Sequence, residues 1–400
     1  MTATTSPAAG AGGMRSAILL LSIGAFFSGA GLRICDALIP RLARDFAITP
    51  GTAGRVVLTF AIAYGLSQLA FGPLGDRYGK ARMVTVALFG CAIGAAACAL
   101  APGFNALTGL RMVWGLAAAG VMPLSMAWIG DAVPYEQRQG MLARLLMGTL
   151  TGMMAGQLAG GLFADSTLGW RGAFAMLAVG YGATAVLLLL RLRHIGMNAA
   201  PRSGSVGFVA QLSTVLREPW ALRVLAAVFA EGVLLLGPMA YLPAYLHQRY
   251  GLTLSAASGL VALYAVGGLV YAMAARHIVQ RWGERRMVLA GGIVMGLAWL
   301  ALYLSPLFWL AGPAALFLGF GTYLYHNTLQ TNATQMAPTA RGTAVAMFAF
   351  CFFFGQAMGV SWAGWAFDQF GAAPLLLIPA VGLPLAGWWF AREMRKRGVS

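Results

Sequence analysis

Five ionisable side chains stand inside long apolar stretches of this chain, and their residue types suit proton transfer or ligand binding. Arg33 and Asp36 lie three positions apart, which places both on one face if the segment is helical. Arg111, Glu231 and His326 each stand in a separate apolar stretch. An ionised group is costly in an apolar environment, so each of the five is a candidate for ion binding, proton transfer or substrate recognition.

The types of these residues suggest particular chemistry. Asp36 and Arg111 suggest a proton switch, because a nearby arginine favours the charged carboxylate whereas desolvation favours the protonated form. The alternative is that Arg33 and Asp36 only neutralise each other as a structural pair. Glu231 has no obvious local partner, which favours proton transfer or binding of a cationic substrate. His326 could carry protons or form a hydrogen-bonded cavity wall.

Around these charges we expect a substrate site of polar and aromatic residues. Trp114 and three tyrosines, Tyr64, Tyr241 and Tyr264, could supply an aromatic wall. The predicted proton-coupling residues are Asp36, Arg111 and Glu231. The predicted substrate-binding residues are Arg33, Asp36, Arg111, Trp114, Gln157, Glu231, Tyr241, Tyr323, His326, Asn327, Gln330 and Gln356.

The composition indicates a membrane protein. Sixty per cent of the 400 residues are hydrophobic and only 10% are charged, with a mean hydropathy of +0.75, whereas a soluble domain carries about 25% charged residues. The net charge of +16 could indicate nucleic-acid binding, but the basic residues stand between apolar runs and form no separate soluble domain, so we expect none. The four cysteines lie in apolar runs without a CxxC pair, which indicates neither disulfides nor a metal site.

Twelve apolar runs are long enough to cross a membrane. They fall at about 16–40, 52–74, 82–101, 104–130, 140–164, 171–192, 221–245, 253–275, 287–305, 308–333, 342–366 and 372–391. Both termini then lie on one side, where twenty Lys and Arg residues fall, against five on the other side and two within spans. The positive-inside rule makes the side of the termini cytoplasmic.

We therefore predict an all-α integral membrane protein with twelve transmembrane helices in two pseudo-symmetric six-helix bundles. The predicted parts are an N-terminal tail at 1–15, bundles at 16–193 and 219–391, a cytoplasmic central loop at 194–218 and a C-terminal tail at 392–400. The halves repeat one another, because Asp76 to Val84 aligns with Gln280 to Val288, 204 positions later. Similar offsets relate Pro134 to Pro338, Gly156-Gln157 to Gly355-Gln356, and Asp165 to Asp368.

A glycine-rich, charged elbow from Gly72 to Arg82 separates the second and third apolar runs. Its pattern Gly72-x-Leu74-x-Asp76-Arg77-x-Gly79-Lys80 resembles the signature of the major facilitator superfamily, and the resemblance extends over the whole chain. It implies the fold predicted above. The second copy has Arg276 in place of Gly72 and Gln280 in place of Asp76, so we expect a weaker contact there.

In that superfamily this cluster is held to latch the two halves in the outward-facing state. We expect the two glycines of the pattern to permit close backbone approach and a tight turn, Asp76 to cap a helix, and Arg77 to reach Asp131 at the end of the fourth run. The alternative is that these charges only anchor a loop to lipid headgroups. The predicted latch residues are Gly72, Asp76, Arg77, Gly79, Lys80 and Asp131.

Other residues resemble the drug:proton antiporters of the superfamily. Asp36 resembles their acidic position near the outer end of helix one, and Arg111-x-x-x-Gly115 resembles their fourth-helix motif, which is linked to proton transfer. The glycine ladder between 148 and 161 resembles their antiporter motif, although Gln157 stands where that motif has proline. In this superfamily spans one, four, seven and ten line the central cavity, and in this chain those spans carry the buried charges.

The sequence contains no GxxxxGK[ST], HExxH, GxSxG or GxGxxG pattern, so we expect neither an enzyme nor a bound cofactor or metal. We predict a monomeric secondary transporter of a bacterial inner membrane that exports a drug-like or metabolite solute in exchange for protons. One alternative is proton-coupled uptake of an organic anion, for which Arg33 and Arg111 would supply positive charge. A more remote alternative is a membrane sensor that does not transport.

Overall fold

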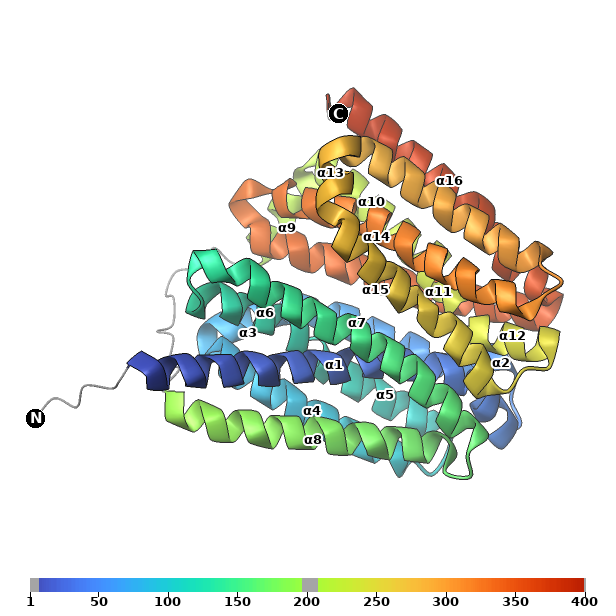
Figure 1. The fold of residues 1–400 in the computed structure, drawn as a ribbon, viewed down its shortest axis with the longest axis horizontal. Helices are drawn as coiled ribbons and strands as arrows, with labels where there is room; N and C mark the ends of the chain where they lie inside the picture. Colours follow the sequence, from blue (N-terminus) through green and yellow to red (C-terminus); the bar gives the residue numbers. More distant parts are fainter. Residues whose placement is uncertain (1–6, 196–207, 399–400) are drawn as a thin grey trace, which may run out of the picture.

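The computed structural model describes residues 7–195 and 208–398, and every regular element in these ranges is a helix. Figure 1 shows two bundles, one coloured blue to green and the other yellow-green to red. The helices of the first half are α1 (Pro7–Asp45), α2 (Pro50–Ala53), α3 (Arg55–Tyr78), α4 (Lys80–Ala99), α5 (Phe104–Ala118), α6 (Val121–Ala132), α7 (Tyr135–Asp165) and α8 (Gly169–Ile195).

The second half begins after the short helix α9 (Phe208–Arg217). Its helices are α10 (Pro219–Glu231), the π-helix η1 (Gly232–Leu236), α11 (Gly237–Met239), α12 (Leu242–Tyr250), α13 (Leu254–Leu304), the 3₁₀ turn η2 (Phe308–Leu310), α14 (Ala311–Gln335), the 3₁₀ turn η3 (Pro338–Ala340), α15 (Arg341–Phe370) and α16 (Ala372–Lys396).

The described ranges contain twelve membrane-spanning helices, as predicted. Ten stretches are long and apolar enough to cross a membrane, and one of them, the 51-residue α13, is two spans joined at Gly283. The remaining span is α7, whose 31 residues are ample for a bilayer although its sequence is more polar. The spans fall into two bundles of six, α1 to α8 and α10 to α16.

The two bundles approach one another at one side and diverge at the other (Figure 1). We call the diverging side, which holds the start of α1, α9 and the C-terminal end of α16, the terminal side. The opposite side, which holds α2 and α12, is the distal side. The hydrogen bonds that join described residues of the two halves all lie on the distal side, where Gly51 and Asp165 meet residues of the second half.

The glycine ladder makes the closest helix contact of the first half. A Cβ at Gly152 would overlap the carbonyl oxygen of Phe26, and a Cβ at Gly156 would overlap that of Ala30, so α7 rests directly on α1. The second half repeats this arrangement, with Gly355 of α15 against Phe229 of α10. The ladder therefore forms a flat face for helix contact, and the duplication seen in the sequence extends to backbone packing.

Both elbows bend at a glycine in the left-handed region. Gly79 has φ 89° and Gly283, its repeat mate, has φ 70°, a conformation that other residues adopt at a cost. The predicted close approach at Gly72 is wrong, because nothing lies within 4 Å of a Cβ placed there. Gly75 makes the close approach instead, against the side chain of Leu124.

Three predicted boundaries shift. The predicted N-terminal tail is helical from Pro7, and the C-terminal helix runs into the predicted tail as far as Lys396. Within the predicted loop 194–218, α8 continues to Ile195 and α9 forms a short helix, while 196–207 lie outside the described residues. The side chain of Thr343 on α15 donates a hydrogen bond of 2.6 Å to Gln211 on α9, so α9 packs on the second half.

Candidate functional site

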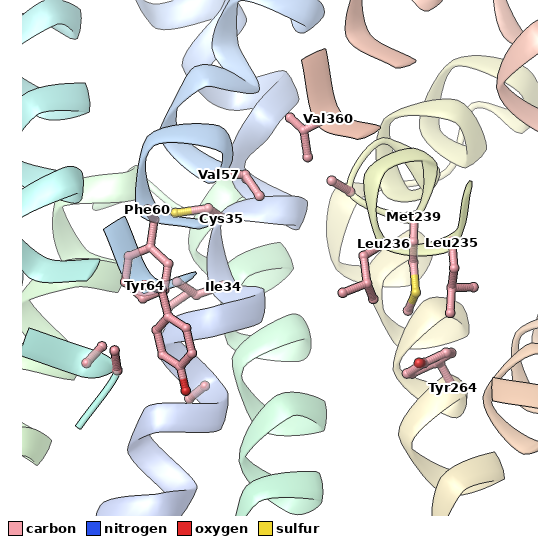
Figure 2. Close-up of a cluster of buried hydrophobic side chains, with 14 of the residues drawn as sticks. Ile34, Cys35, Val57, Phe60, Tyr64, Leu235, Leu236, Met239, Tyr264 and Val360 are labelled. Atoms are coloured by element: carbon pink, nitrogen blue, oxygen red, sulfur yellow. The ribbon is translucent and has the colours of Figure 1, made fainter. Parts of the chain in front are cut away.

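A cavity of about 260 Å³ lies between the two halves. Its wall is mainly apolar and includes Tyr64 of α3 and Tyr264 of α13, which Figure 2 shows on opposite sides of the gap between the halves. The ring of Tyr64 packs against Phe353 of α15, with centroids 4.4 Å apart. We call this space the central cavity; both halves contribute to its wall.

An arginine–aspartate pair from the first half stands at this cavity. Arg33 lines the cavity, and its NH1 donates a hydrogen bond of 3.1 Å to Oδ2 of Asp36. Asp36 is 1% exposed and lies behind the arginine, and its Oδ1 has no partner among the described residues. The guanidinium also reaches across to the second half, 5.7 Å from the ring centre of Tyr264. The pair therefore links the two halves at the cavity wall.

A glutamate–histidine pair from the second half faces the same cavity. Glu231 is fully buried, and its Oε2 lies 3.0 Å from Nδ1 of His326, which lines the cavity. Glu231 has no partner close to it in the sequence, as expected, and its partner in the fold lies 95 positions away on α14. The span that carries Glu231 becomes irregular directly after this residue, where α10 is followed by the π-helix η1. The π-helix ends shortly before Pro238, which has no N–H to donate to a regular helical hydrogen bond.

The two pairs share one orientation. In each pair the basic side chain lines the cavity and the carboxylate is buried behind it: Arg33 in front of Asp36, and His326 in front of Glu231. The side chain of His326 is 18% exposed whereas that of Glu231 is not exposed at all. A solute in the cavity therefore meets the basic side chains before it meets the carboxylates.

Several of the other predicted substrate residues also reach this region. Tyr323, Gln330 and Gln356 line the central cavity. Gln157 lines a small adjoining recess together with Arg33, and its Nε2 has no partner among the described residues.

Four other predicted substrate residues lie away from the central cavity, and three of them lie elsewhere within one half. Arg111 is 1% exposed in the core of the first half, where its guanidinium stacks 4.0 Å from the ring centre of Phe60 and 4.5 Å from that of Trp114. Trp114 is fully buried beside it. Asn327 turns away and donates a hydrogen bond of 3.0 Å to the hydroxyl of Tyr271.

The fourth, Tyr241, belongs to the distal side. Its hydroxyl donates a hydrogen bond of 3.1 Å to the carbonyl of Val360. The predicted switch between Asp36 and Arg111 is not formed in this state, because Asp36 bonds Arg33 and Arg111 donates from Nε to the carbonyl of Val56.

Sequence reasoning missed an aromatic strip on α15. Phe348, Phe352 and Phe353 line the central cavity, and the ring of Phe352 lies 4.6 Å from that of His326, centre to centre. The signal was present in the run Phe348 to Phe354, which holds five phenylalanines in seven positions. This run is typical of an ordinary apolar stretch of a transmembrane helix. Only the position of α14 in the fold shows which of its rings line the central cavity.

Two aspartates join the halves on the distal side. Asp165 ends α7, and its carboxylate accepts hydrogen bonds of 3.1 and 2.7 Å from the backbone N–H groups of Leu254 and Ser255, at the start of α13. Asp368, near the end of α15, accepts one of 2.9 Å from the N–H of Gly51 in α2. The two contacts are related by the internal repeat, and each places a carboxylate at the positive end of a helix in the other half.

The pKa of the Asp165 carboxyl reflects this contact. Partial burial raises the pKa, but the N–H groups of Ser255 and Leu254 outweigh that effect and bring it below its usual value of 3.8. The ionised form is therefore the one that holds the distal contact.

The predicted latch residues form a contact within the first half. Lys80, and not Arg77 as predicted, pairs with Asp131 of α6, and it also lies 3.6 Å from Asp76. Arg77 stacks on the ring of Tyr78. Asp76 does not cap α4, whose N-cap residue is Gly79 with no side-chain hydrogen bond, because Asp76 lies within the last turn of α3.

The second elbow repeats this contact in altered form. Glu284 occupies the position that corresponds to Lys80, and it accepts a hydrogen bond of 2.8 Å from Nδ2 of Asn332 on α14. Each elbow is thus bound to the fourth span of its own half. The second contact pairs one charged side chain with a neutral amide, whereas the first pairs Lys80 with two aspartates.

Comparison with known proteins gives a consistent result over nearly the full length. Residues 21–360 match the sequence profile of the Major Facilitator Superfamily. The chain is 29% identical over 383 residues to the probable transporter SCO4007 of Streptomyces coelicolor, covering 92% of this chain and 85% of that protein. It is 25% identical over 399 residues to the gallate transporter of Pseudomonas putida, covering 90% and 86%.

A solved structure gives the same picture of the fold. The crystal structure of a bacterial homolog to the human lysosomal transporter Spinster, in an inward-facing and occupied conformation, superposes with a TM-score of 0.76 at 16% identity and covers 99% of both chains.

Proposed function

Since this chain belongs to the major facilitator superfamily, we propose that protons drive its transport and that the two acid–base pairs at the central cavity couple protons to solute. The chain is a transporter of small solutes and not an enzyme. The observation that carries the proposal is that each half supplies one buried carboxylate held by a basic side chain at the same cavity, Asp36 with Arg33 and Glu231 with His326.

The proposed mechanism is alternating access by rocking of the two halves. By the positive-inside rule the terminal side is cytoplasmic, in a bacterial inner membrane, and the distal side faces outward. The state described here is then inward-facing, because the halves are joined on the distal side. Opening the other side requires the contacts of Asp165 and Asp368 to break.

The pairs suit proton coupling because their ionisation depends on their surroundings. An isolated charge in a low-dielectric site is costly, so protonation of Asp36 or Glu231 would release its basic partner for another ligand. A partner freed in this way would favour an anionic solute. Proton and solute would then move together, which makes uptake the direction we propose. The Pseudomonas putida relative is named a gallate transporter, and gallate is an organic anion, which supports an anionic solute.

Proton-coupled export is the second candidate. It is favoured by Asp36, by Arg111 with Gly115 and by the glycine ladder, all of which resemble the drug:proton antiporters. The ladder packs as a helix interface in the structure, which supports a structural role for it in either direction of transport.

Transport in proteoliposomes with an imposed pH gradient tests the proposal. We expect accumulation of an organic acid such as benzoate, driven by an inward proton gradient and above the level in protein-free liposomes, with loss of this protein-dependent accumulation in Asp36→Asn or Glu231→Gln. Asn327→Ala is the control, because Asn327 lies next to His326 in sequence but bonds Tyr271 away from the cavity. If the rate of solute transport by the unmodified protein does not depend on the pH gradient, proton coupling is ruled out. Solute transport in the direction opposite to the proton flow would favour export.

A further inference from the structure

We infer that the central cavity binds a small aromatic carboxylate, with its carboxylate between Arg33 and His326 and its ring against the aromatic side chains of α3 and α15. This inference rests on the proposed function only in taking the central cavity as the transport site. Three features of the described residues carry it: the free hydrogen-bonding capacity at the cavity wall, the size and lining of the cavity, and its charge.

The two basic side chains at the wall keep hydrogen-bonding capacity in reserve. Arg33 uses NH1 for Asp36, and its Nε and NH2 have no hydrogen-bond partner among the described residues. His326 uses Nδ1 for Glu231, which leaves Nε2 available. A carboxylate has two oxygens and accepts paired N–H donors from a guanidinium well. The acids of both pairs lie behind their bases, so a cationic group in the cavity would meet the bases first.

The size of the cavity restricts the ligand. Its volume of about 260 Å³ corresponds to about nine waters at about 30 Å³ each, which leaves room for a single aromatic ring carrying one carboxylate. The wall away from Arg33 is aromatic, with Tyr64 and Phe353 in contact on one side and Phe352 beside His326. Aromatic rings pack well at offset and edge contacts with such a wall. A sugar would leave much of this apolar surface unused.

The charges at the cavity require that an anion enters with a proton. With His326 neutral, the two pairs sum to one negative charge, from Arg33, Asp36 and Glu231. A bound carboxylate adds a second, and a buried site of that charge is strongly disfavoured. One proton taken up by the Glu231–His326 pair restores the original balance and leaves Nε2 with a hydrogen to donate toward the ligand. The other titratable groups that face this histidine are Glu231 on α10, Arg33 on α1 and the tyrosines of α3 and α13.

Equilibrium binding to the purified full-length protein tests the inference without any transport. We expect benzoate to bind, measured by calorimetry, and benzamide and benzylamine to bind at least about tenfold more weakly, as expected for a lost charge-assisted contact. Acetate should also bind more weakly, because it leaves the aromatic wall empty. Benzylamine binding as tightly as benzoate would overturn the inference.

Variants of the cavity wall, a control variant and one proton measurement sharpen the test. Arg33→Gln should weaken benzoate binding at least about tenfold, while Asn327→Ala should bind as the unmodified protein does. If Arg33→Gln does not fold, Arg33→Lys serves in its place with a smaller loss, because lysine keeps the charge without the planar pair of donors. Mixing the unmodified protein with benzoate in weak buffer should take up about one proton per ligand, and His326→Gln should lower that uptake. No proton uptake together with unchanged binding in the arginine variants would contradict the inference.

Failure of this inference and failure of the proposed function give different results. Proton-driven transport of some other solute, with no benzoate binding, would overturn the ligand class and leave the coupling intact. Benzoate binding with no effect of a pH gradient on transport would overturn the coupling and support the ligand class.

Discussion

Replacing the two distal aspartates should shift the balance between the closed and open states of the distal side. Asp165→Asn and Asp368→Asn each keep the shape of the side chain and remove the charge that faces a helix start. A charge at such a position contributes about 1 kcal/mol where it is partly exposed. Each single change should therefore raise the open-to-closed ratio by about fivefold, and the double change, costing about 2 kcal/mol, by about 30-fold.

The assay is the labelling rate of a cysteine placed behind this contact. Val57 is 2% exposed in the buried cluster between the halves (Figure 2), so Val57→Cys in a background without the native cysteines should react with a membrane-impermeant maleimide from the distal side only when the halves part. Asp45→Asn is the matched control, since Asp45 is a distal aspartate that bonds Arg41 of its own half. Equal rates in both single variants and the unmodified protein, or an equal effect of Asp45→Asn, would refute the reasoning.

Three further predictions address the elbow, the glycine ladder and pH. Lys80→Gln should roughly double amide hydrogen exchange in the elbow, as expected from the loss of an ion pair of about 0.5 kcal/mol, whereas Arg77→Gln should not; the reverse ranking would restore the pairing expected from the sequence. Gly152→Ala should lower the yield of folded protein in size-exclusion chromatography, because overpacking costs about 1–3 kcal/mol, while Gly130→Ala, with open space around it, should not. Because the pKa of Asp165 is lowered by the closed contact, its contribution is present above the usual value of 3.8 and is lost as pH falls further. Distal labelling, measured relative to an exposed reference cysteine because the thiolate fraction falls with pH, should therefore increase below about pH 4, and a pH-independent ratio there would contradict this.

The fold could be predicted from the sequence because its signals are local or periodic. The twelve apolar runs follow from hydropathy alone, and the elbow pattern and its echo 204 positions later identify the duplication. Gly79 and Gly283 then adopt the same unusual backbone conformation, which a repeat of sequence at a tight turn implies. The ladder of α7 packs as its four-residue spacing indicates, since such spacing puts all members on one face.

The side-chain partners at the site could not be predicted in the same way. Glu231 and His326 were each singled out, but their contact depends on how α14 lies against α10, which no local pattern encodes. Arg111 was expected to act with Asp36, yet the rings of Phe60 and Trp114 surround its guanidinium and satisfy it by cation–π contact. Either Arg77 or Lys80 of the elbow could pair with Asp131, and the backbone turn between these two residues determines that Lys80 makes the contact.

Because α13 joins two spans, a tilt of its first span displaces the bend at Gly283. From its start at Leu254 to the bend at Gly283, its first arm is about 40 Å long at 1.5 Å per residue. Asp165 holds one end of that arm, and the Glu284–Asn332 contact lies at the other. A tilt of about 10° about the distal end would carry the bend about 7 Å, far more than a hydrogen bond tolerates unless α14 moves with it. A small displacement at Asp165 should thus move α13 and α14 together, and His326 lies on α14.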